Sequence, residues 1–133
     1  MPRRTRSEEL LDFEIHFYEK LLSAYPDFVD VLIPLGEAYT RQGSHEKGLA
    51  VDVRLTELRG TDPISWYNLA CSYALLNRLD DSLGALRKAF DLGYSDLAHL
   101  QKDPDLTSLR QSPKYRDLLA AFAPAQKTHP TPS

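Results

Sequence analysis

The chain has 133 residues, of which 42% are hydrophobic and 26% charged, the composition of an ordinary globular protein. A formal net charge of -3 without a basic stripe excludes a generic nucleic-acid binder, and no apolar run approaches the roughly 18 residues that cross a membrane. The single Cys71 excludes an internal disulfide and fits a reducing compartment, so we expect a cytoplasmic protein without nucleic-acid or membrane partners.

The residue usage favours helices. The chain contains 22 Leu against 7 Val and Ile together, and no long stretch alternates apolar and polar residues. Residues 1–6 are expected to be a flexible tail. Thr5 and Glu8 have the spacing of a capping box, which predicts a first helix from there to Ala24, before the break at Pro26.

Four more helices follow at regular intervals. The second is expected from about residue 27 to residue 42, because Gly43 is a natural left-handed terminator. The third begins after a Ser44 cap and ends near Gly60. Asp62 supplies a cap for the fourth, which carries Trp66 and ends around residue 77. The fifth is expected over residues 79–93.

Shorter helical pieces are predicted beyond residue 95. We expect them over residues 96–102, over residues 104–110 after the cap Asp103, and over residues 113–122 after the cap Ser112. Residues 124–133 contain three prolines and few apolar side chains, so we expect a disordered tail there.

One apolar pattern occurs twice, on the second and fourth predicted helices, at a separation of 34 residues. The paired positions are Leu32 with Trp66, Leu35 with Leu69, Gly36 with Ala70, and Tyr39 with Tyr73. Each set lies on one helix face, and the small residue allows the partner helix to approach closely. A period of this length, one helix pair long, is typical of a solenoid in which each pair is covered by its neighbour.

These residues resemble the tetratricopeptide repeat family. The stretch "WYNLACSYALLNRLDDSLGALRKAF" matches most of the family signature, "LIPLGEAYTRQGSHEKG" matches with Leu in place of Trp, and "FYEKLLSAYPD" is similar to the close of a preceding repeat. The segment "LAHLQKDPDLTSLRQSPKYRDLL" looks like the closing segment that follows the last repeat in many bacterial members.

The resemblance implies an all-α superhelix of about five repeat helices with two or three short capping helices. It implies one domain over residues 7–123, made of a half repeat (7–28), two repeats (29–62 and 63–96) and a cap (97–123). The implied structural core is Leu32, Leu35, Gly36, Tyr39, Trp66, Leu69, Ala70, Tyr73, Leu86 and Ala89.

Three residues depart from the family pattern. Pro34 falls one turn inside its helix, where it removes a backbone hydrogen bond and predicts a bend. Asp52 replaces a usual aromatic, and Glu14 stands where a small residue is expected. We interpret both as polar residues at the edge of an end repeat, with a functional carboxylate as the alternative.

The sequence offers no catalytic constellation, metal set or cofactor motif. The four histidines lie on separate segments, and no phosphate-binding loop or nucleophile elbow is present. Cys71 has no histidine close in sequence, so we expect an inert, half-buried thiol. The chain is therefore predicted to be a protein that is not an enzyme.

A binding function is the remaining expectation. In proteins of this family, the positions beside the buried face line a concave groove that holds a peptide or helix of a partner protein. Here these positions are Ile33, Glu37, Thr40, Arg41, Tyr67, Asn68, Cys71 and Leu75. Two alternatives stay open: the C-terminal helices cover this groove, or the chain forms a homodimer through the half repeat around Leu11, Phe13 and Phe17.

Overall fold

The computed structural model describes residues 3–127, and every regular element in that range is helical. The described elements are α1 (Arg6–Ala24), α2 (Val29–Gln42), α3 (His45–Leu58), α4 (Pro63–Leu75), α5 (Leu79–Asp91), α6 (Leu97–Lys102), the 3-10 helix η1 (Pro104–Leu106), α7 (Thr107–Arg110) and α8 (Pro113–Lys127). The expected all-α class is confirmed. Among the described residues, no helix is both long and apolar enough to cross a bilayer.

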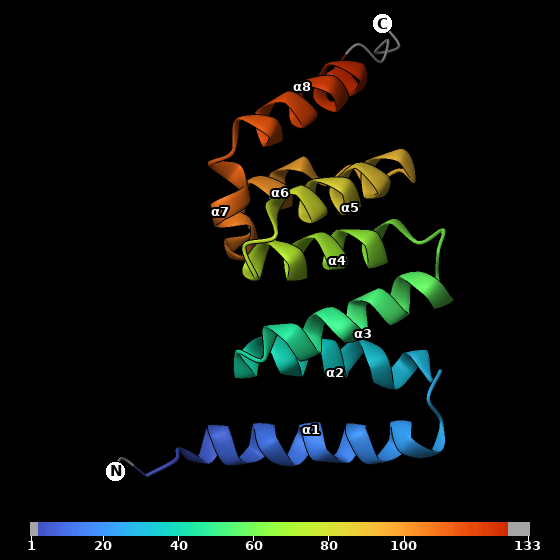
Figure 1. Cartoon of the computed structure of the whole chain (residues 1–133), viewed down its shortest axis with the longest axis vertical. Coiled ribbons are helices and arrows are strands. Elements are labelled where there is room, and N and C mark those ends of the chain that lie inside the picture. The colour runs from blue at the N-terminus through green and yellow to red at the C-terminus, as the bar shows by residue number, and fades with distance from the viewer. Residues whose placement is uncertain (1–2, 128–133) are drawn as a thin grey trace, which may run out of the picture. The chain divides into compact units, whose positions relative to one another are not determined.

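The chain divides into two compact units, one of Met1–Thr61 and one of Asp62–Ser133. The break falls one residue before the predicted junction between the two repeats. We call the two parts unit 1 and unit 2 and describe each by itself. In unit 1, α2 runs antiparallel to α1, and α3 runs antiparallel to α2 (Figure 1). The single domain and the stacking of the two hairpins on each other stay predictions.

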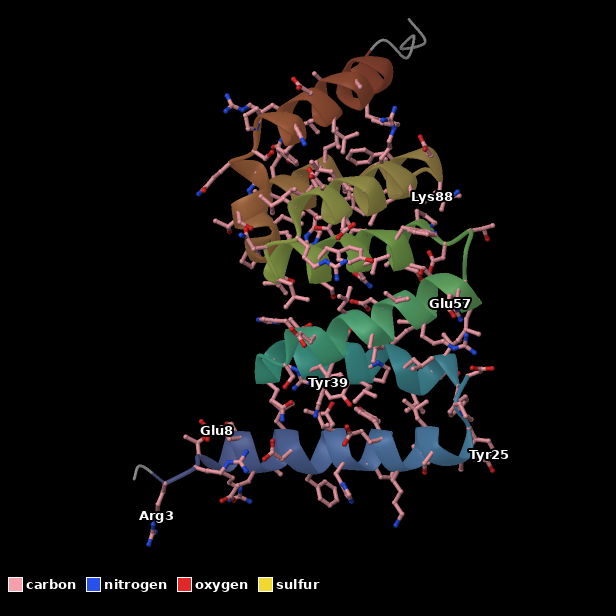
Figure 2. All side chains as sticks on the ribbon, viewed as in Figure 1. Arg3, Glu8, Tyr25, Tyr39, Glu57 and Lys88 are labelled. Atoms are coloured by element: carbon pink, nitrogen blue, oxygen red, sulfur yellow. The ribbon has the colours of Figure 1, made fainter. Side chains whose placement is uncertain are left out.

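Unit 1 is held by an apolar core between its three helices. Its buried members are Ile15, Leu32, Leu35, Ala38, Tyr39, Val51 and Leu55, with Leu11, Tyr18, Leu22, Val29 and Leu58 packed against them. Tyr39 lies on the side of α2 that faces α1, and its hydroxyl donates a 2.5 Å hydrogen bond to Glu19 Oε2 (Figure 2). This bond fixes α1 against α2 at a point where the buried phenol needs a polar partner.

Local signals begin and end these helices. The Thr5 hydroxyl accepts the Glu8 amide at 3.1 Å and the Glu8 carboxylate accepts the Thr5 amide at 3.3 Å, which confirms the capping box. Asp62 accepts the Ile64 amide at 3.0 Å and so caps α4. Ser44 occupies the cap position of α3 but its side chain makes no capping bond, and its hydroxyl donates to Gln42 Oε1.

The turns that close α2 and α4 have the same geometry 34 residues apart. Gly43 ends α2 at φ 84°, and the Ser44 amide donates to the Tyr39 carbonyl at 2.9 Å. Asn77 follows α4 at φ 58°, and the Arg78 amide donates to the Tyr73 carbonyl at 2.9 Å. The left-handed conformation explains glycine at the first site, and asparagine is one of the few other residues that adopts it readily.

The crossings inside the two hairpins also correspond. A Cβ added at Gly36 on α2 would lie 3.2 Å from Val51 Cγ1 on α3, so glycine permits this close approach. In the second hairpin, the Ser82 hydroxyl on α5 donates to the Ala70 carbonyl on α4 at 2.7 Å. Both crossings therefore depend on small residues at the repeat positions that the sequence indicated.

Unit 2 is closed by the segment after α5. Leu100, Leu106 and Leu109 of this segment are completely buried, as is Leu86 on α5. The ring of Phe122 on α8 lies 4.9 Å from that of Phe90 on α5. These contacts attach the C-terminal helices to the second hairpin as a cap.

One expectation about helix extent needs revision. The predicted disordered tail starts at residue 124, but α8 continues through Lys127. The rest of that predicted tail, residues 128–133, lies outside the described residues. Pro34 sits inside α2 (Val29–Gln42), and the bend expected there stays a prediction.

Candidate functional site

The part of the predicted groove on α2 remains open in places. Ile33 is 39% exposed, and Glu37 is exposed one turn further along. The Thr40 hydroxyl is used within the helix, where it donates to the Gly36 carbonyl at 3.1 Å. Arg41 is exposed and pairs with Glu14 at 3.0 Å. The α2 surface thus offers one apolar and one acidic side chain to a partner.

The part on α4 is largely occupied by the protein itself. Tyr67 is 4% exposed, and its ring stacks on that of Tyr94 with centroids 4.5 Å apart and planes at 5°. Its hydroxyl donates a hydrogen bond to Asp103, just before η1. The expectation that Tyr67 and Cys71 face an open groove is therefore wrong, and the alternative of coverage by the C-terminal segment holds at these two positions.

Asp103 is the centre of this closure. It is 8% exposed, and its two carboxylate oxygens accept hydrogen bonds from the Tyr67 hydroxyl and, at 3.0 Å, from the Asp105 amide. His99 Nε2 lies 3.4 Å from the carboxylate, and Arg110 donates to the Asp103 carbonyl at 2.7 Å. The contacts of this buried carboxylate with Tyr67 and Cys71 tie the cap to α4.

Cys71 lies in the same cluster, with its sulfur 3.7 Å from Asp103 Oδ2. Burial, and next the charges of Asp103 and Asp105, raise the pKa of the Cys71 thiol well above its ordinary value. Burial likewise raises the pKa of Tyr67, with Cys71 and Asp103 contributing. The thiol is therefore protonated at neutral pH, which is the unreactive form for nucleophilic chemistry.

Cys71, Asp103 and Asp105 also bring potential metal-ligand atoms within 4.8 Å of one another. The two carboxylate oxygens of Asp103 already accept hydrogen bonds from Tyr67 and Asp105. The cluster is explained by its role in holding the cap. The other two predicted groove residues on α4 differ in accessibility: Asn68 is exposed and Leu75 is half-buried.

The predicted core residues are mostly inside. Those that are buried are Leu32, Leu35, Gly36, Tyr39, Leu69, Ala70, Leu86 and Ala89. Trp66 and Tyr73 are only half-buried, and each lies beneath a cation of α5 or its cap: Lys88 Nζ is 5.9 Å from the Trp66 ring and Arg78 Cζ is 4.9 Å from the Tyr73 ring. Asp52 is buried rather than at an edge, and Glu14 forms the ion pair with Arg41.

An exposed apolar row lies on α1. Leu10, Phe13 and Phe17 are 60%, 73% and 52% exposed, and their spacing of three and four residues puts them on one face. Leu11 and Ile15 pack into the core from the opposite face. Side chains project from α1 on the side away from α2 as well as toward it (Figure 2). The sequence indicated this surface but included Leu11, which faces inward, in place of Leu10.

Fold and site together define an all-helical protein of repeat-like hairpins, with one covered groove segment and one uncovered helix face. The chain is 33% identical over 93 residues to a chloroplastic protein of Arabidopsis thaliana. The matched region is 65% of this chain but only 27% of that protein, so the chain corresponds to about a quarter of its relative. No protein-family model matches the chain.

Proposed function

We propose that the chain is a non-catalytic protein–protein interaction module made of tetratricopeptide-type hairpins, which binds another protein on the outer face of α1. The equivalent turns after α2 and α4 and the equivalent small-residue crossings support the repeat assignment. A superhelix with the two hairpins stacked on each other is part of this proposal, as are a cytoplasmic location and the lack of a cofactor.

The exposed row of Leu10, Phe13 and Phe17 is the observation that carries the proposal. A helix with apolar side chains on two opposite faces is suited to packing against two neighbours, and α2 covers only one of them. Clustered aromatic side chains at the surface are typical of binding sites because their burial contributes much of the affinity of an interface.

The open remainder of the groove is the second candidate site. Ile33 and Asn68 are exposed, and an asparagine can bond the backbone of an extended peptide. Tyr67, one of the groove residues expected from the sequence, is buried and has no accessible face for this purpose. This difference in accessible apolar surface favours α1 over the groove.

Affinity capture with cross-linking from the native cell tests the proposal. The double variant Phe13→Ser/Phe17→Ser is compared with Ile33→Ala/Asn68→Ala, since both change exposed side chains and should leave the fold intact by circular dichroism. We expect the first variant to lose at least about tenfold in capture and the second to retain it. The opposite result places the site in the groove, and equal capture by all forms contradicts both surfaces.

A further inference from the structure

We infer that the outer face of α1 binds a second copy of this chain, so that two α1 helices pair antiparallel in a symmetric dimer. This inference rests on the proposed function, because it names the occupant of the same surface. Three features of α1 carry it: the spacing of the face, the charges at its two ends, and the symmetry that an antiparallel pair imposes on them.

The spacing extends beyond the three apolar residues. Arg6, Leu10, Phe13, Phe17, Lys20 and Ala24 follow one another at alternating intervals of four and three. This alternation is the seam pattern of two helices that pack side by side over several turns. The 19 residues of α1 make a helix of roughly 28 Å, long enough for the whole seam to take part.

Charged side chains lie at both ends of the seam. Near the N-terminus of α1 the seam contains Arg6 and is bordered by Glu9, near the C-terminus it contains Lys20, and all three are exposed. None of these three side chains forms an ion pair with any described residue, whereas Glu8, Asp12 and Glu14 on the same helix all do. The face therefore presents an unpaired acid and an unpaired base about three turns apart.

An antiparallel pair brings these charges together twice. Suppose that the twofold axis crosses the seam at the level of residue 15 along α1. Phe13 of one copy then meets Phe17 of the other, and Leu10 meets the aliphatic stem of Lys20. The same rotation places Glu9 of one copy beside Lys20 of the other, because both lie on the same edge of the seam. A parallel pair would instead bring Arg6 and Lys20 of the seam to the level of their own copies, which places like charges near each other.

The expected affinity is modest. One helix face is smaller than the interface of about 1,600 Å² that stable complexes commonly bury. We therefore expect a dissociation constant on the order of 10 μM, measurable by sedimentation equilibrium from about 1 to 500 μM.

Three substitutions test the pairing in the full chain. Phe13→Ser/Phe17→Ser should weaken the dimer at least about 100-fold, since four rings are lost per dimer. Lys20→Glu should weaken it about 3- to 10-fold, and adding Glu9→Lys should restore it, because the pairs are re-formed with reversed charge. Ile64→Ser is the control for loss of an exposed apolar side chain outside α1, and it should leave the constant unchanged.

Cysteine cross-linking tests the orientation. Mixed Leu10→Cys and Lys20→Cys chains should form a disulfide with each other faster than either forms with itself, and the reverse order would overturn the antiparallel arrangement. Two results would overturn the inference. One is a wild-type chain that stays monomeric at about 500 μM, the top of the range set by the expected affinity. The other is a dimer that Phe13→Ser/Phe17→Ser leaves intact. If such a monomer still captures a partner through Phe13 and Phe17, the proposed function stands without the dimer.

Discussion

Removing the Tyr67 hydroxyl should weaken the attachment of the C-terminal cap to α4 and lower the free energy of unfolding. In Tyr67→Phe the buried Asp103 carboxylate loses one of its donors, while the ring can keep its stacking on Tyr94. A hydrogen bond to a charged group contributes roughly 1.5–3 kcal/mol, so we expect the free energy of unfolding to fall by about 2 kcal/mol. That is a substantial part of the total stability of a small domain.

The assay is urea unfolding followed by circular dichroism, with Tyr67→Phe, Asp103→Asn and the double variant forming a cycle. The coupling energy between the two positions should be about 1–3 kcal/mol, because Tyr67→Phe removes the donor of this bond and Asp103→Asn removes the charge of its acceptor. Tyr73→Phe is the matched control, since its half-buried ring has no hydroxyl hydrogen bond among the described contacts. A stability loss for Tyr67→Phe no larger than for Tyr73→Phe, or a coupling near zero, would refute the role of this bond.

Three further outcomes are expected. Gly36→Ala should be less stable than Gly48→Ala in urea unfolding, because its new Cβ lies 3.2 Å from Val51 whereas the closest atom at Gly48 is 3.7 Å away. Gly48→Ala should raise the free energy of unfolding by up to about 1 kcal/mol. A reversed order of the two variants would contradict the tight crossing at Gly36. In the same assay, Gly43→Ala should lower the free energy of unfolding by about 1 kcal/mol and Asn77→Gly should raise it by about 0.5 kcal/mol, since both positions have positive φ. Changes of the same sign at the two sites would argue against equivalent turns. Above about pH 9 the free energy of unfolding should fall by up to about 1.4 kcal/mol per pH unit, because the unfolded chain releases the Cys71 proton that the folded chain retains, and Cys71→Ala should remove this part of the slope; a slope unchanged by the substitution would contradict the raised pKa.

The sequence predicted what depends on near neighbours in the chain. The capping box at Thr5, the stop at Gly43 and the cap at Asp62 all involve residues within four positions of each other, so their chemistry is visible in a short window. The 34-residue recurrence was visible for the same reason, as two local patterns compared with each other.

What the sequence could not show depends on distant contacts. Tyr67 and Asp103 are 36 residues apart, and nothing local to either residue indicates that the cap will close over α4. The sequence also placed Leu11 rather than Leu10 on the outer face of α1. Periodicity alone does not decide between these two neighbours, because α1 has apolar residues on two faces.

Carbene footprinting of the full chain tests most directly whether another protein chain covers the outer face of α1. Labelling of Leu10, Phe13 and Phe17 is measured in dilute protein, in concentrated protein and in the captured complex. We predict that labelling of these side chains falls in at least one bound state, while that of Ile33 and Ile64 stays constant. Unchanged labelling on α1 in every bound state, with protection at Ile33 instead, would contradict the account.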